Sequence, residues 1–449
     1  MTSRVVVLRK PQGKVALETG FLYTEADVRA IAARSAEPDW LLERRLLAWR
    51  TFVATPMPTI HDEAWRRTDI HDLPARMMAL RPADDLAVDG ELLQPLVGEG
   101  KGAMVVIRPG LPTQTASHAE LKAKGVAFLD WKTAVAEQGE LLRRVMSTVV
   151  PPSEGKFAAL ATALAHDGVV VVIPSGVELE APLHSIFWSP GTHAGFFSRV
   201  LVVLGERASC TFVHETASPT EANGAALHAG IVELSLAPDS RLTFVELQNW
   251  GQHVWNFTHE RAKVERDAKL NWIFGAVGSH LTKNFTELTL EGRGAEGRMS
   301  GFYFADGAQH LDHDTQQNHK APHTTSDLLF KGALLDRSRS VWQGMIYVAP
   351  GAQKTDGYQA NRNLILSRRA RADSIPGLEI LADDVRCTHG ATVGQLEEEP
   401  LYYLMSRGIP RRDAERLVVN GFFAEVMTRI PFEQVRERFQ RMIEEKMGG

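Results

Sequence analysis

The middle of the chain, residues 167–393, is built from short runs in which hydrophobic and polar residues alternate. Examples are "GVVVVIPSGVELEAPL", "SRVLVVLGERASCTFVHE" and "ALHAGIVELSLAPDSRLTFVEL". A period of two is typical of β-strands that bury one face. The runs are broken by turns rich in Asp, Gly, Arg and Ala, so this part of the chain is predicted to be mainly β.

A short unit recurs along this β-rich stretch: an apolar pair, a polar turn, a small residue and another alternating run. Examples are "VLGERASCTF", "KVERDAKLNW" and "LLDRSRSVWQ". The small residues after the turns are Ala208, Ser240, Ala268, Ala295, Ser338, Ala352 and Ala370, with Val385 as the last member. Several of the spacings between these residues are close to about 15 residues or to twice that length, which is typical of stacked repeats. We therefore predict a β-solenoid. A β-sandwich is the alternative, and the scarcity of Asn-Gly hairpin turns counts against it.

The regions on either side of the β-rich stretch have helical periodicity. Residues 1–166 are predicted to be mainly helical. Within them, "TEADVRAIAARSAEPDWLLERRLLAWRTFVA" should form two helices that are separated at Glu37-Pro38. Residues 394–449 return to a helical pattern, so the domain organisation is a β-solenoid flanked by two helical regions.

The C-terminal region contains two amphipathic helices. One apolar stripe consists of Ala414, Leu417, Val418, Phe422 and Val426, and the second consists of Phe432, Val435, Phe439, Met442 and Ile443. Helices of this kind after a β-rich domain either pack against the solenoid or bind a partner, and the periodicity fits both.

Composition excludes several functional classes. The net charge of −5 gives no general attraction to nucleic acid or to an anionic membrane, and no apolar run approaches the ~20 residues of a membrane span. The N-terminal "MTSRVVVLRKPQGK" has too short an apolar run for a secretory signal. Two cysteines cannot form a disulfide framework. We therefore expect a cytoplasmic protein.

The stretch "DDVRCTHGATVGQL" holds one of the two cysteines, Cys387, with His389 two residues later. In a strand, residues i and i+2 point to the same face, so the thiol and the imidazole could share one site. Such a pair binds soft metals, and the imidazolium can lower the pKa of the thiol. The alternative is a buried thiol and a hydrogen-bonded histidine at the end of a strand. No third group or oxyanion hole marks a cysteine protease.

A second cluster of candidate ligands is "HLDHDTQQNHKAPH". It contains His310, His313, His319 and His323, with Asp312 and Asp314 between them. Four histidines in this length suggest a metal site, but the spacing matches neither H-E-x-x-H nor a zinc finger. The alternative is a polar turn of the solenoid. The chain has no P-loop, and Cys210 lies in an apparent strand that favours a buried core position.

Residues 310–409 resemble the SufD family of iron–sulfur cluster assembly proteins. The similar text includes "NHKAPHTTSDLLFKG", "VWQGMIYVAPGAQKTDGYQANRNLILS" and "PGLEILADDVRCTHGATVGQLEEEPLYYLMSRGI". A weaker similarity extends over the β-rich stretch and to "WLLERRLLAWRTF" near the N-terminus. The paralogue SufB has an "EHEAT"-like string where this chain has "CTHGAT". The resemblance implies a right-handed parallel β-helix with helical N- and C-terminal regions.

The resemblance also implies a function: a non-catalytic scaffold in a cytoplasmic complex with SufB and the ATPase SufC. In this family the two paralogues pair through their β-helices, and the cluster forms near that contact. SufC binds the C-terminal helices, and the complex is associated with reduced flavin. The histidine at the position of His389 is tied to cluster assembly, with Cys387 beside it. The cluster would be transient, with no stable metal site in the isolated chain, and a homodimer is expected when partners are missing.

Two other functions fit the same sequence. A β-helix enzyme, either a lyase or an acyltransferase, would place acidic, lysine or histidine side chains in a groove along the solenoid. A metal-binding protein would use the four histidines of residues 310–323.

Overall fold

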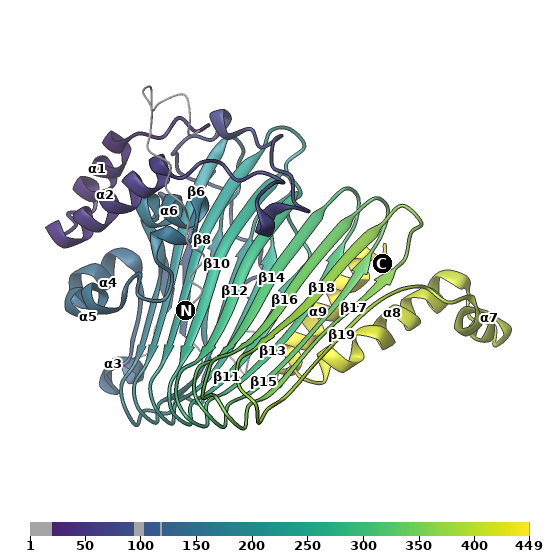
Figure 1. The fold of residues 1–449 in the computed structure, drawn as a ribbon. Helices are drawn as coiled ribbons and strands as arrows, with labels where there is room; N and C mark the ends of the chain where they lie inside the picture. Colours follow the sequence, from purple (N-terminus) through teal and green to yellow (C-terminus); the bar gives the residue numbers. More distant parts are fainter. Residues whose placement is uncertain (1–19, 94–102, 117–118, 449) are drawn as a thin grey trace.

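Two long parallel β-sheets face each other and form a solenoid in the computed structural model, which describes residues 20–93, 103–116 and 119–448 (Figure 1). Sheet A contains β4 (Asp167–Ile173), β6 (Ala194–Leu204), β8 (Ala226–Leu236), β10 (Val254–Val264), β12 (Leu281–Leu290), β14 (His310–His319), β16 (Arg339–Val348) and β18 (Arg371–Ile380), in that spatial order. Sheet B contains β5 (Leu183–Trp188), β7 (Ser209–Ala217), β9 (Arg241–Asn249), β11 (Lys269–Ala276), β13 (Glu296–Ala305), β15 (Thr325–Leu334), β17 (Asp356–Ile365) and β19 (Arg386–Gln395).

The predicted β-solenoid is confirmed, and the β-sandwich alternative is wrong. Consecutive strands alternate between the two sheets, and each strand pairs in parallel with the strand two elements later. The N-terminal end of the solenoid is completed by β1 (Ala103–Ile107), β2 (Gln114–Ala116) and β3 (Ala127–Asp130). There β2 pairs antiparallel with β1, and β3 pairs antiparallel with β4.

The turns that lead from sheet A to sheet B explain the sequence repeat. One residue of each turn has a left-handed backbone, and this position recurs on six successive coils: Arg207, Asp239, Asp267, Gly294, His323 and Lys354. Gly and Asp adopt this conformation more readily than most residues. The next residue enters the core, so it is small: Ala208, Ser240, Ala268 and Ala295 are completely buried. Four of the eight small residues in the repeat therefore lie at these corners, whereas Ser338 and Ala370 lie in turns that lead back from sheet B to sheet A.

The space between the sheets is filled by columns of stacked side chains, one side chain from each coil. Phe212, Phe244 and Trp272 occupy one column of sheet B in register, with ring centroids 5.6 Å apart at each step. Parallel pairing in register places equivalent side chains directly above one another. The core is therefore a stack of layers, and each layer depends on the coil above and below it.

The outer face of sheet A is covered by N-terminal helices (Figure 1). The helices of this region are α1 (Glu25–Arg34), α2 (Asp39–Ala54), α3 (Ala119–Ala123), α4 (Trp131–Glu137), α5 (Gly139–Val145) and α6 (Lys156–Leu164), with short 3₁₀ turns at Glu63–Trp65, Ala75–Met77 and Pro152–Glu154. The predicted separation at Glu37-Pro38 is confirmed, with Pro38 as the N-cap of α2. Phe157 of α6 stacks on Phe257 of β10 at 3.8 Å, which joins the helices to the sheet.

The outer face of sheet B is covered by the C-terminal helices α8 (Arg411–Met427) and α9 (Glu433–Lys446), whereas α7 (Glu398–Ser406) extends beyond the solenoid (Figure 1). The ring of Phe439 lies 4.4 Å from that of Phe302. A Cβ at Gly275 would lie 2.7 Å from the Phe439 ring, so only glycine admits this contact. The predicted stripe of α9 is confirmed at its four residues from Val435 onward.

The predicted stripe of α8 is confirmed at Ala414 and Val426, whereas Val418 and Phe422 are only half-buried and Leu417 is exposed. The buried residues of α8 are Ala414, Val419, Phe423 and Val426. Leu417 was expected to be buried, yet half of its surface is exposed. Two overlapping apolar faces run along this helix, and the face that meets Phe302 and Phe304 of sheet B is the one that packs. The other face is left at the surface.

No helix among the described residues combines the length and the apolar character needed to cross a membrane. Residues 1–14, where no secretory signal is expected, lie outside the described part of the chain.

Candidate functional site

The C-terminal end of the solenoid is open. β18 pairs with β16 and β19 pairs with β17, and in the described chain neither strand has a neighbour on its other side. The edges of both sheets therefore present unpaired backbone N–H and C=O groups at the same end of the molecule. Such edges are templates for pairing with another strand.

Cys387 and His389 lie on β19, in this last coil. Cys387 is in register with Gly357 and His389 with Gln359, and Gln359 is fully buried inside the solenoid. The two side chains therefore occupy interior columns, yet His389 is exposed and Cys387 is half-buried because no further coil covers them. The expectation that the two residues share a face fits this register.

Gly357 creates a notch on the inner side of Cys387. A Cβ at residue 357 would lie 3.2 Å from Cys387 Sγ, 3.3 Å from Ile346 Cγ2 and 3.5 Å from His319 Nε2. The thiol and the His319 imidazole thus face the same small space from opposite sides of the coil that contains Gly357. A larger residue at 357 would separate them.

His319 is held in this position by two hydroxyl groups. Its Nδ1 lies 2.7 Å from Thr324 Oγ1, and its Nε2 lies 2.7 Å from Ser326 Oγ. Thr324 donates to the carbonyl of Ala321, so its oxygen accepts from Nδ1–H. Nε2 is then the acceptor, oriented toward Ser326 and the notch. His319 therefore has one orientation and one tautomer.

The environment of Cys387 favours the neutral thiol. Burial raises its pKa above the ordinary 9.0, and the charge of Asp356 acts in the same direction. The hydrogen bond with the backbone of Gly357 opposes this shift. A nucleophilic thiol needs a lowered pKa, so the cysteine is not activated by its own chain.

The second cysteine lies in the same interior column of sheet B. From β7 to β19, this column consists of Cys210, Leu242, Leu270, Gly297, Ser326, Gly357 and Cys387. Neighbouring strands are ~4.8 Å apart, so the two sulfur atoms are separated by roughly 30 Å. Cys210 is buried in the main core, and burial raises the pKa of its thiol to about 12.

The four histidines of residues 310–323 do not converge. His310 and His313 have opposite environments: His310 Nε2 lies 2.9 Å from Thr68 Oγ1 on the outer side, while His313 packs against Tyr303 and Phe330 inside. His323 occupies the left-handed position of a turn. Across the ranges that the structure describes, no three His, Cys, Asp or Glu residues are placed to hold a metal ion.

His319 and Gly357 were missed as neighbours of Cys387 when the sequence was considered alone. A signal for them exists in the repeat, because Ser326, Gly357 and Cys387 follow one another at intervals of about 30 residues, one full coil. Extending the register of the repeat would have placed Ser326, Gly357 and Cys387 in one column of sheet B. His319 lies beside this column because its Nε2 is 2.7 Å from Ser326 Oγ.

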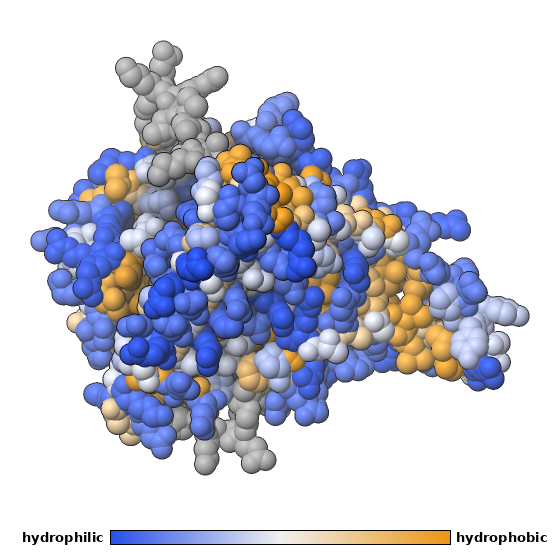
Figure 2. Space-filling model, turned by 60° about the horizontal axis from the view of Figure 1, so that its bottom comes forward, coloured by the Kyte–Doolittle hydropathy of each residue, from blue (hydrophilic) through white to orange (hydrophobic). Residues whose placement is uncertain are grey.

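Apolar side chains surround the open end. The exposed fractions are 38% for Ile380, 51% for Leu381 and 48% for Val393. Ile380 and Val393 follow Val348 and Asn363 in register, so they continue interior columns that end at the surface. Hydrophobic surface is visible toward this end of the molecule, beside the C-terminal helices (Figure 2). Contiguous exposed apolar surface is typical of a protein interface.

A second apolar surface lies on the helices beyond the solenoid and consists of Tyr402, Tyr403 and Met405 of α7 with Leu417 of α8. The exposed fractions of the two tyrosines are 75% and 58%. Arg407 lies over the Tyr403 ring at 5.2 Å. Within the described chain α7 packs mainly on α8, which leaves this face accessible. Tyrosine and arginine are enriched in the hot spots of interfaces.

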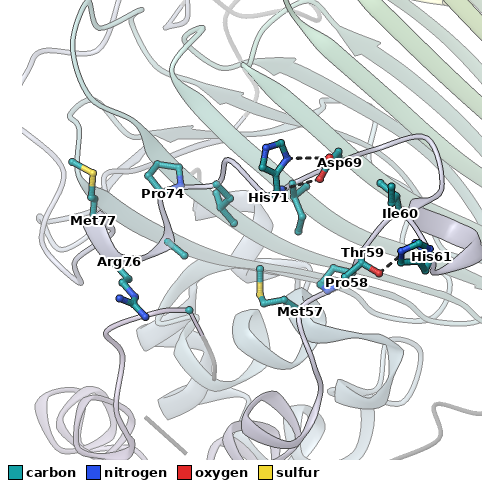
Figure 3. Close-up of a pocket in the computed structure, with 14 residues that line it drawn as sticks. Met57, Pro58, Thr59, Ile60, His61, Asp69, His71, Pro74, Arg76 and Met77 are labelled. Atoms are coloured by element: carbon teal, nitrogen blue, oxygen red, sulfur yellow. Dashed lines mark hydrogen bonds and ion pairs between the residues drawn. The ribbon is translucent and has the colours of Figure 1, made fainter. Parts of the chain in front are cut away.

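Two grooves in the described part of the chain lie away from Cys387 and His389. A groove of about 700 Å³ is formed by residues 57–61 and 69–77, with His71 hydrogen-bonded to Asp69 at its rim (Figure 3). A groove of about 490 Å³ on sheet B contains Arg241, Lys269 and Arg298 but has no aromatic lining. Neither groove combines an aromatic surface with a set of phosphate ligands, so neither of these two grooves fits a flavin.

The chain is similar in sequence to known proteins over most of its length. Residues 187–422 match the family model described as the SUF system FeS cluster assembly, SufBD core domain. Residues 21–184 match the SufBD protein N-terminal region. An iron–sulfur cluster assembly SufBD family protein of Staphylococcus saprophyticus is 30% identical over 440 residues, covering 95% of this chain and 93% of the relative. Relatives of the same description in Staphylococcus haemolyticus and Staphylococcus aureus are each 29% identical with the same coverage.

The two cysteines should differ in reactivity. In the folded chain, iodoacetamide should alkylate Cys387 and leave Cys210 unmodified, with a rate that rises with pH because the thiolate is the reactive form. Asp356→Asn should increase the rate at Cys387 several-fold at pH 8, since it removes a charge that disfavours the thiolate. Peptide mapping by mass spectrometry measures both rates. Asp239→Asn, in a turn of a distant coil, is the control; an unchanged Cys387 rate in Asp356→Asn would contradict this description.

Proposed function

Because this chain belongs to the SufBD family of iron–sulfur cluster assembly proteins, we propose that it is a SufD-like scaffold subunit of the SUF complex. In this role it pairs with SufB through the open end of the solenoid and carries the SufC ATPase on its C-terminal helices. A new cluster forms at the contact between the two solenoids.

The observation that carries this proposal is the open last coil. β18 and β19 leave one edge of each sheet unpaired, and interior residues such as Val393 reach the surface there. A second solenoid placed against this end would continue both sheets and bury the exposed columns. A paralogue with the same coil geometry is suited to do this. A second copy of this chain would use the same surface when SufB is missing.

The candidate ligands at this end form an incomplete set. Iron–sulfur clusters are usually held by four protein ligands, and this coil offers one thiol and one imidazole. Cys387 remains a neutral thiol in the isolated chain, so binding of iron must accompany loss of its proton. The remaining ligands come from the partner, and the cluster is a transient product rather than a resident cofactor.

The second apolar surface, Tyr402, Tyr403, Met405 and Leu417, is the proposed docking site for SufC. It lies on the protruding helix α7 and on the face of α8 that sheet B does not cover. α7 projects away from the solenoid (Figure 1), so SufC bound there leaves β18 and β19 free for SufB. The chain itself is a non-catalytic scaffold that receives the energy of ATP hydrolysis through this contact. The complex works in the cytoplasm, and reduced flavin belongs to the complex rather than to a site derived from this chain.

The lyase or acyltransferase alternative has less support. Its substrate would lie in the groove of about 490 Å³ on sheet B. Lys269 in this groove is paired with Glu296 at 2.9 Å, and Arg298 lies 3.7 Å from Asp327. Charged side chains that are paired in this way are poorly suited to acid–base chemistry on a substrate.

His389→Ala should leave the complex assembled but abolish cluster accumulation, because the exposed imidazole contributes to the shared site and not to the core. Cys387→Ala should have a smaller effect, since SufB can supply thiolate. Iron and sulfide analysis of the complex purified from cells, with its absorbance spectrum, measures the cluster. His61→Ala, an exposed histidine of the N-terminal groove, is the matched control. A normal cluster content in His389→Ala would refute the role of this residue.

Leu417→Glu and Tyr402→Glu should each weaken binding of the ATPase by more than about tenfold, because a charge placed in an apolar hot spot is strongly unfavourable. Both side chains are exposed, so the thermal stability of the chain should not change. Co-purification and titration calorimetry measure the interaction. Leu22→Glu, at an exposed leucine of the N-terminal region, should bind normally. Equal affinities for all three variants would place the docking surface elsewhere.

A further inference from the structure

A polar chamber lies inside the N-terminal half of the solenoid, between the two sheets. It encloses a cavity of about 20 Å³, which is enough for one water molecule. Its polar lining consists of Ser198, His214, Thr216, His228, Glu246, Gln248, Asn256, Thr258, Glu260 and Asn284. These residues come from β6, β7, β8, β9, β10 and β12, so the chamber spans several coils.

Two carboxyl groups meet in this chamber. Glu246 of β9 and Glu260 of β10 line the same small cavity, and both are buried, with exposed fractions of 5% and 1%. Glu260 also accepts a hydrogen bond of 3.1 Å from Thr286 Oγ1. Two buried carboxyl groups that share one cavity repel each other when both are ionised, which favours retention of a proton on at least one of them.

No charge inside the chamber compensates these carboxyls. The titratable groups that face them are His214 of β7 and His228 of β8, and burial lowers their pKa values to about 3 and about 4, so both are neutral. The facing side chains of β6, β11 and β12 are Ser198, Phe274 and Asn284 with Thr286. The nearest cations on β10 and β12, Arg261 and Lys283, point to the outer face and are paired with Glu154 and Asp312.

The chamber also contains acceptor atoms that lack a donor among the described residues. They are Glu246 Oε2, Glu260 Oε1 and Thr258 Oγ1, all in side chains that are more than nine-tenths buried. Buried acceptors of this kind nearly always have a partner, and the adjoining cavity has room for one. Carboxyl protons and a single water molecule provide the donors that these oxygens need.

We propose that Glu246 and Glu260 form a proton-holding site at the centre of the solenoid, in which a proton retained at neutral pH and one buried water join the two carboxyl groups. Loss of this proton places an uncompensated negative charge between β9 and β10 and loosens the coils on either side. The site therefore makes the free energy of unfolding decrease at alkaline pH. It is independent of the open end and of the proposed scaffold function.

The pH dependence has a definite sign. Burial and the mutual charge raise the pKa of Glu246 well above its ordinary 4.5, and burial raises that of Glu260. The folded chain therefore binds protons that the unfolded chain has released. The resulting stability is complete below the unfolded pKa near 4.5 and is lost as the pH rises through the raised folded values. One such proton changes the unfolding equilibrium constant by about tenfold per pH unit.

The test compares urea unfolding of the wild-type chain with Glu246→Gln and Glu260→Gln between pH 8 and pH 10, where the histidines are almost entirely neutral in both the folded and the unfolded state. Glutamine keeps the shape and can donate a hydrogen bond without carrying a charge. We expect the wild-type stability to fall with pH and each variant to lose about a tenfold change per pH unit of this dependence. Glu206→Gln, at an exposed turn, should follow the wild type.

Infrared spectroscopy of the wild-type chain provides a measurement that does not depend on folding of a variant. The C=O stretching band of a protonated carboxyl should be present at pH 8. It should disappear in the double variant that carries both Glu246→Gln and Glu260→Gln. The proposal would be overturned if the free energy of unfolding of the wild type and of the glutamine variants depended on pH in the same way. It would also be overturned if the wild type lacked this band. Metal analysis that finds one divalent ion per chain in the wild type and none in the double variant would overturn it as well, because the site would then hold a cation instead of a proton.

Discussion

Hydrogen bonding between successive coils is the interaction on which the rest of this structure depends. Each strand of sheets A and B receives its register from the strand two elements earlier, so equivalent side chains stack in columns from β4 and β5 to β18 and β19. The same rule leaves the last coil without a partner. Every inner strand is hydrogen-bonded on both sides, whereas β18 and β19 each have one unpaired edge. The candidate ligands Cys387 and His389 lie in this last coil.

Both the notch at Gly357 and the polar chamber are formed where the columns of stacked side chains change in character. At the open end, Gly357 removes a side chain from the column and brings Cys387 and His319 to one notch. In the middle, buried apolar side chains of later coils, such as Met299 and Phe330, lie between this end and the polar chamber of Glu246 and Glu260. Placing polar groups inside a core is costly unless they are paired, so each of these sites depends on close packing of the coils around it.

The repeat of turn and small residue was sufficient to predict the solenoid, because the left-handed turn and the buried corner impose composition on every coil. The phase of α8 was not predictable, since two apolar faces overlap on that helix and only contact with Phe302 decides between them. Local spacing also overstated the histidine cluster: strand alternation and a turn send His310, His313 and His323 in different directions. The chamber was missed because Glu246 and Glu260 look like the outward-facing positions of their strands until the register is known.

The central claim is that the open coil is completed by another chain. Hydrogen–deuterium exchange of the backbone amides in β18 and β19, measured for the isolated chain and for the purified complex with SufB, tests it most directly. Unpaired edge amides should exchange rapidly in the isolated chain at a concentration that keeps it monomeric, and should become strongly protected in the complex. The amides of β8 and β10, in the centre of sheet A, should not change. Equal exchange of β18 and β19 in both samples would contradict the account.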